Sequence, residues 1–156
     1  MTREQITNLF EKVTKKNPSY KNYVIDDRDI YFDEEEHSYQ VVASHGDISI
    51  WFYIPEDCDS TTAEKIMERY LNAVIPNVDY ETEKIDFAAK RIVKSGRYKY
   101  IEDCNFSFPE KLLFDSEHFT IAIDYNDSLY NDLENLFNFV NSKLEIMEKR
   151  AQTGKV

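Results

Sequence analysis

Glycine is scarce in this chain of 156 residues, with only Gly46, Gly96 and Gly154. Enzymes that bind nucleotides through a P-loop or a dinucleotide-binding fold hold the phosphates in a glycine-rich loop. Three widely separated glycines cannot build such a loop, so the sequence excludes both enzyme classes. Proline is also scarce, with four residues, and the low counts of both argue against a disordered or linker-rich chain.

Cysteine is rarer still. Cys58 and Cys104 are too few and too far apart to read as a disulfide framework, so we expect free thiols in a reducing compartment. Carboxylates flank both, with Asp57 and Asp59 around Cys58 and Asp103 before Cys104. Because a nearby negative charge disfavours the thiolate, each thiol is expected to be a poor nucleophile.

Long apolar runs are missing. The longest lies around Ile48–Ile54, whereas a membrane-spanning helix needs about 20 consecutive apolar residues. The N-terminal residues do not place an apolar run after a basic region, as a secretory signal would. The sequence therefore predicts a cytoplasmic protein without membrane contact.

Basic residues are outnumbered. The chain has 19 lysines and arginines against 30 aspartates and glutamates, a formal net charge of −11. A protein that binds nucleic acid by neutralising phosphates needs a basic surface, and anionic membranes repel an acidic one. We expect no direct contact with nucleic acid; the partner would be a protein with a basic surface, attracted by long-range electrostatics.

Amphipathic periodicity predicts three helices, over residues 2–16, 61–75 and about 128–149. The second is expected to end at Pro76, and the first at Asn17-Pro18. The expected capping residues are Thr2 with Gln5, Thr61 with Glu64, and Asp127-Ser128.

Short alternating segments between these helices predict strands. Their expected ranges are 23–25, 30–32, 38–43, 48–54, 97–101, 105–108, 112–114 and 118–125. Gly46 supplies the turn of a hairpin joining 38–43 to 48–54. Residues 82–95 fit a helix ending at Gly96, the favoured interpretation, and also a strand.

Together these elements predict an α+β fold, an antiparallel sheet of about five to seven strands with N-terminal, central and long C-terminal helices. Residues 1–150 are expected to form a single domain, followed by a frayed tail at 151–156.

Two short motifs resemble functional ones and are incomplete. His118-Phe119-Thr120 resembles one half of the paired His-x-Thr/Ser motifs of two-histidine phosphoesterases, but no second half occurs, so His118 is expected to be structural. Asp124–Ser128 resembles the start of an EF-hand loop, yet Leu129 replaces the glycine at position six and Asn135 the glutamate at position twelve. This segment is expected to be the turn and cap before the last helix.

The most unusual segment is acidic. Acids concentrate at 26–36, at 56–59 and from Glu102 through Glu134. In the first stretch seven carboxylates stand against Arg28 alone, and their mutual repulsion would be relieved by a cationic partner, by a divalent metal or by solvent screening. We expect a partner-binding site there, formed by Asp26, Asp27, Asp29, Tyr31, Asp33, Glu34, Glu35 and Glu36.

Tyrosines interleave with these acids, and tyrosine is a favoured anchor at protein interfaces. The composition is similar to that of phage-encoded DNA-mimic inhibitors and bacterial toxin-immunity proteins, without a shared motif. The predicted function is an acidic inhibitor of a partner such as a nuclease toxin or a nucleic-acid-handling enzyme, with no catalytic residue, metal or cofactor assigned. The alternative is a small metal-dependent hydrolase that uses the clustered carboxylates.

Overall fold

The computed structural model describes residues 1–75, 99–105, 108–124 and 133–153. Its centre is a six-stranded antiparallel sheet in the order β1-β2-β3-β6-β5-β4. The strands are β1 Ile30–Asp33, β2 Ser38–His45, β3 Ile48–Pro55, β4 Lys99–Asn105, β5 Phe108–Asp115 and β6 Phe119–Asp124. The helices are α1 Arg3–Lys16, α2 Ser60–Ala73 and α3 Leu133–Gln152, with short 3-10 turns η1 Pro18–Tyr20 and η2 Asp27–Asp29. The predicted α+β class, with N-terminal, central and C-terminal helices, is confirmed.

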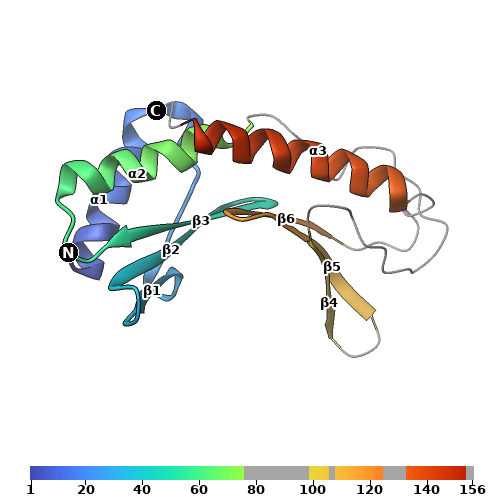
Figure 1. Cartoon of the computed structure of the whole chain (residues 1–156), viewed down its shortest axis with the longest axis horizontal. Helices are drawn as coiled ribbons and strands as arrows, with labels where there is room; N and C mark the ends of the chain where they lie inside the picture. Colours follow the sequence, from blue (N-terminus) through green and yellow to red (C-terminus); the bar gives the residue numbers. More distant parts are fainter. Residues whose placement is uncertain (76–98, 106–107, 125–132, 154–156) are drawn as a thin grey trace.

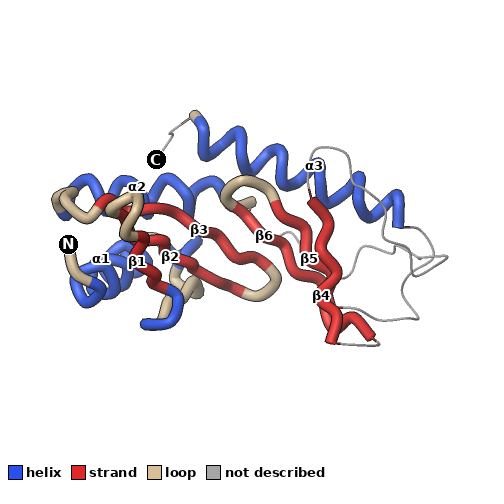
Figure 2. Tube along the Cα trace, turned by 60° about the horizontal axis from the view of Figure 1, so that its bottom comes forward, coloured by secondary structure: helices blue, strands red, loops and turns tan. Residues whose placement is uncertain are grey.

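The helices pack on one face of the sheet. In β3 every second side chain is buried, as the alternation predicts for a sheet covered on one side. Helix α2 lies on β3 and contacts both other helices, while α3 continues over β5 and β6. Figure 2 shows the strands from below, where no described helix crosses them.

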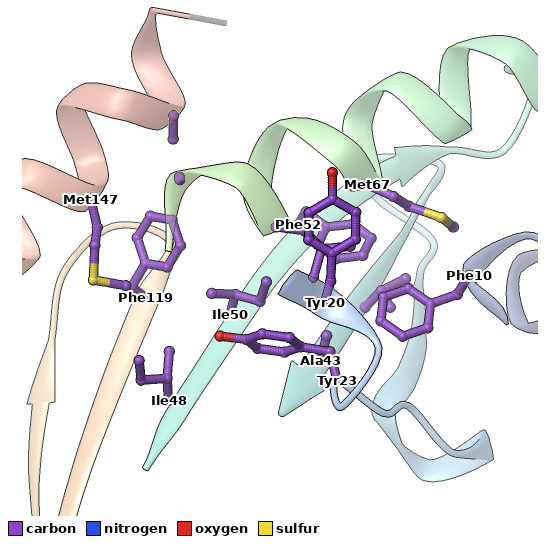
Figure 3. Packing of buried hydrophobic residues seen from close by; sticks show 14 of the residues in the cluster. Phe10, Tyr20, Tyr23, Ala43, Ile48, Ile50, Phe52, Met67, Phe119 and Met147 are labelled. Atoms are coloured by element: carbon purple, nitrogen blue, oxygen red, sulfur yellow. The ribbon is translucent and has the colours of Figure 1, made fainter. Parts of the chain in front are cut away.

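The hydrophobic core lies between this face and the helices. Phe52 of β3 and Met67 of α2 are both fully buried, as are Phe119 of β6 and Met147 of α3 (Figure 3). These residues belong to one cluster. The core therefore ties both halves of the sheet to the helical layer.

The observed ends of α1 are the predicted ones, whereas the observed N-cap of α2 differs from the predicted one. Thr2 caps α1 and exchanges hydrogen bonds with Gln5, and Asn17 ends the helix, as predicted. The predicted cap of α2 at Thr61 is wrong: the side chain of Asp59 accepts the hydrogen bond from the Thr62 backbone N–H at 2.7 Å. Aspartate is the stronger N-cap residue, and the Thr61–Glu64 spacing only imitates the motif.

The strand predicted at residues 23–25 is also wrong. Around Val24 only an isolated bridge to Ser44 forms, because η2 interrupts the chain before β1 begins. Of the strand predicted at 105–108, Asn105 ends β4 and Phe108 begins β5, whereas residues 106 and 107 lie outside the described residues. Strand β5 includes and extends the strand predicted at 112–114. The predicted hairpin turn is confirmed, with Gly46 at a φ of +56°.

The last helix is longer at its C-terminal end than predicted. It reaches Gln152, and Ala151 is only 3% exposed, so these residues belong to the helix rather than to a tail. The ambiguous segment 82–95 and the predicted cap at Asp127-Ser128 lie outside the described residues. None of the described helices has the length and apolar character needed to cross a membrane.

Candidate functional site

Strand β1 divides the predicted acidic site into two groups. Asp26, Asp27 and Asp29 precede the strand, at η2, whereas Asp33 ends it and Glu34–Glu36 follow. A strand of four residues spans about 13 Å at about 3.3 Å per residue. Tyr31 lies between the groups and is 64% exposed.

The carboxylates at η2 stabilise their own backbone. Asp26 accepts a hydrogen bond from the Arg28 backbone N–H at 2.8 Å, and Asp29 accepts one from the Asp26 N–H at 2.9 Å. The first of these lowers the pKa of Asp26, and the Arg28 side chain adds to the effect. Part of the clustering of acids here is therefore a capping pattern.

The turn after β1 uses one carboxylate in the same way. Asp33 Oδ1 accepts hydrogen bonds from the backbone N–H groups of Glu35 at 3.0 Å and Glu36 at 3.2 Å. His37 closes the turn with a φ of +50°. Glu34, Glu35 and Glu36 are exposed, so they carry the charge of this turn while Asp33 holds its shape.

Pairing of β2 with β3 adds two acids that the sequence placed in a separate cluster. Ser38 pairs with Pro55, and the Glu56 N–H donates to the His37 carbonyl at 2.9 Å. Glu56 and Asp57 are exposed beside the β1–β2 turn. We call the combined surface the acidic end, formed by Asp33, Glu34, Glu35, Glu36, Glu56 and Asp57.

The acidic end has little positive charge to balance it. Among the described residues its ionic neighbours include His37, whose Nδ1 lies 3.8 Å from Glu56 Oε2 and is charged only when protonated, and the N-terminal ammonium of Met1, which donates to the Glu56 backbone carbonyl at 2.6 Å. The predicted hairpin could have revealed this surface, since a turn at Gly46 sets position 38 opposite position 55. That register was not used in the sequence prediction.

The face of the sheet away from the helices carries a row of three polar and aromatic side chains. Tyr31 pairs with Gln40 in register, and Gln40 pairs with Tyr53, which is 47% exposed. Directly opposite residues in an antiparallel sheet project from the same face. We call these three residues the tyrosine row. Of them, the sequence prediction included only Tyr31.

A second cluster joins α3 to the turn between β5 and β6. Glu148 is 6% exposed, and its Oε1 accepts the backbone N–H of His118 at 2.6 Å and the Ser116 hydroxyl at 2.7 Å. Its Oε2 lies 3.0 Å from His118 Nδ1. Tyr70 of α2 packs against the imidazole, with ring centroids 5.0 Å apart. These contacts agree with the expectation that His118 has a structural role. The sequence analysis did not identify Glu148 as its partner.

Both charges in this cluster are stabilised. The hydrogen bond to Glu148 raises the pKa of His118 above its usual value, although burial opposes it. Burial acts to raise the pKa of Glu148, but the hydrogen bonds from His118 and Ser116 outweigh it and lower that pKa. Glu117 and Arg69 also face His118 and act in opposite directions on its pKa.

Ligand-type atoms of Glu117, His118 and Glu148 lie within 4.8 Å of one another, the one such group in the described part of the chain. Glu148 already accepts three hydrogen bonds. The ligand atoms that remain for a metal ion are therefore His118 Nε2 and Glu117 Oε1, which lie 3.9 Å apart. Protein zinc sites use three or four ligands, so the geometry favours a structural role. We call Glu148, His118 and Ser116, which hold the β5–β6 turn to α3, the clamp. Among the described side chains, the carboxylates of residues 26–36 do not form such a metal-ligand group.

The clamp predicts a pH dependence of stability. Because the pKa of His118 is raised in the folded protein, its contribution to the free energy of unfolding is complete below the ordinary histidine pKa of about 6.5. This contribution is lost as the pH rises through the pKa of His118 in the folded protein. Because the pKa of Glu148 is lowered in the folded protein, its contribution to the free energy of unfolding is complete above the ordinary glutamate pKa of about 4.3. This contribution is lost as the pH falls through the pKa of Glu148 in the folded protein. Urea unfolding from pH 4 to pH 9 should therefore show the difference between wild type and His118→Gln largest between about pH 4.3 and 6.5. A difference independent of pH would contradict this.

The described cysteine is not activated. Burial raises the pKa of the Cys58 thiol, and the charges of Asp59 and Asp57 raise it further, as predicted for its neighbours. Asp124, the first residue of the EF-hand-like segment, ends β6, and residues 125–132 lie outside the described part.

Comparison with protein-family models, curated proteins and solved structures finds no match to this chain. Its function is therefore inferred from its own geometry and charge.

Proposed function

We propose that the protein is an acidic intracellular binding protein that inhibits a partner with a basic surface. The observation that carries this proposal is the acidic end, where exposed carboxylates from two strand connections meet beside Tyr31. A net charge of −11 attracts a basic partner over distances longer than a direct contact.

Inhibition would be steric and electrostatic. A nuclease toxin or another nucleic-acid-handling enzyme holds phosphates in a basic groove, and clustered carboxylates can occupy such a groove in their place. The turn from Asp33 to His37 supports this mode of binding because internal hydrogen bonds already order it. Binding then loses little conformational entropy at the turn.

The test begins with the partner recovered by affinity purification of the tagged protein from its native host. Glu34→Lys combined with Glu36→Lys should reduce the association rate by about tenfold or more and weaken its salt dependence, because exposed interface charges act mainly on association. Asp33 is left unchanged since its carboxylate orders the turn. Stopped-flow or surface plasmon resonance at several salt concentrations measures both effects.

The matched control is Glu11→Lys combined with Glu145→Lys, which changes the net charge equally on α1 and α3. Its association rate should stay within about threefold of wild type if local charge steers the encounter. Equal slowing by both variants would assign the effect to net charge alone. Unchanged binding by the acidic-end variant would reject this surface as the interface.

A further inference from the structure

Exposed apolar and aromatic side chains gather on the face of the sheet away from the helices. Of the four large hydrophobic residues exposed in the described part of the chain, Tyr31, Tyr53 and Val24 lie on this face. Val24 is placed there by its bridge to Ser44, at the far end of β2 from the acidic end. Trp51 and Val42, a cross-strand pair between these positions, are partly exposed.

The tyrosine row offers two exposed aromatic side chains, one on each side of Gln40, between which a flat group can be accommodated. Tyr31 and Tyr53 flank Gln40 on neighbouring strands, and strands lie about 4.8 Å apart, which sets the two tyrosine backbones about 10 Å apart. A planar group stacked between two rings needs about 7 Å, at about 3.5 Å for each contact. Gln40 forms the floor, where its amide oxygen can accept a hydrogen bond.

The charge around the row selects a cation. Asp33 lies two residues beyond Tyr31 on β1, and Glu56 lies three residues beyond Tyr53 of β3, so the acidic end borders the row on both strands that flank β2. A guanidinium is planar, stacks on aromatic faces and donates several hydrogen bonds at once, whereas an ammonium is compact and strongly hydrated. Both are attracted by the carboxylates, but of the two only the guanidinium has a flat face that stacks on a tyrosine ring.

The geometry points to the tyrosine row as an arginine-binding platform, whose occupant is an arginine side chain on the basic surface of the partner. This inference rests on the proposed function and adds the residue type that the partner presents. The acidic end supplies attraction that any basic segment would feel, and the row supplies the preference for arginine over lysine.

Two synthetic peptides of equal charge, hexa-arginine and hexa-lysine, separate these contributions. Titration calorimetry at fixed ionic strength should show hexa-arginine binding at least about fivefold more tightly, in line with the stacking contribution of a guanidinium. Tyr31→Leu combined with Tyr53→Leu should remove this preference and leave the hexa-lysine affinity within about twofold. The matched control, Tyr31→Phe with Tyr53→Phe, keeps the ring faces and should keep the preference. Glu34→Lys with Glu36→Lys should weaken both peptides alike.

The outcomes are distinguishable. Equal, salt-dependent affinity for both peptides, or a preference that survives the leucine variant, overturns the platform and leaves the proposed function standing. Absence of binding by either peptide overturns both. Sedimentation velocity of the free protein adds a further arm, because a dimer that the leucine variant dissociates would make a second copy the occupant and overturn the inference. Thermal melts of each variant, with both tyrosines exposed, should stay close to wild type.

Discussion

Glu148→Ala is expected to lower the free energy of unfolding by about 3 kcal/mol, because breaking a buried, hydrogen-bonded charge pair on one side leaves its partners unsatisfied. Glu148 accepts from the His118 backbone, the Ser116 hydroxyl and the His118 ring. Alanine removes both acceptor oxygens and with them all three hydrogen bonds. The β5–β6 turn then loses its attachment to α3. Urea unfolding followed by circular dichroism near pH 6 measures the change.

Two variants control this experiment. Glu148→Gln keeps an acceptor oxygen for the His118 N–H and the Ser116 hydroxyl but carries no charge, so it should lose less stability and lose the pH dependence assigned to His118. Glu145 lies on the same helix, where its partly exposed carboxylate pairs with Lys149 at 3.4 Å. Glu145→Ala should lower the free energy of unfolding by less than about 1 kcal/mol. A loss as small at Glu148 as at Glu145 would reject the clamp.

Phe52→Ala should be more damaging, with a loss of about 3–5 kcal/mol from the free energy of unfolding. Phe52 has no exposed surface, and its ring stacks on that of Tyr70, with centroids 5.9 Å apart and planes 8° apart. It sits where β3 meets α2 (Figure 3). Truncation opens a cavity between the sheet and the central helix, which the neighbouring side chains fill only in part. Equilibrium denaturation in urea gives the value.

The adjacent residue provides the comparison. Tyr53 follows Phe52 on the same strand but projects from the opposite face and is 47% exposed. Tyr53→Ala should cost no more than about 1 kcal/mol, as for a substitution outside the core. Similar losses at positions 52 and 53 would mean that both faces of β3 are covered, contrary to the arrangement of the helices.

The sequence predicted the fold best where local signals agree. At α1 the capping residues, the apolar spacing and the stop at Asn17 all indicate the same boundaries, and the structure has them. Between β2 and β3 the alternation in residues 48–54 and the glycine turn likewise indicate a hairpin, and the structure has it. Residues 23–25 were predicted as a strand, but the hydrogen bonds of Asp26 with the following turn compete with strand pairing there.

The candidate site was predictable in part. Acidic clustering indicated the segment around β1, yet composition does not distinguish a carboxylate that caps a turn, such as Asp33, from one that faces solvent, such as Glu35. The contribution of Glu56 depends on strand pairing across the hairpin. Glu148 was missed because its partner, His118, is 30 residues away, and helical periodicity carries no information about such a contact.

The position of β1 has a consequence for self-association. It is an outer strand of the sheet, and an outer strand presents unpaired backbone groups on which another chain can extend the sheet. Here the strand is only four residues long, with carboxylates immediately before and after it. A second copy approaching this edge would bring like charges together at both ends of the strand. The carboxylates proposed to attract a basic partner thus also protect the sheet against aggregation through this edge.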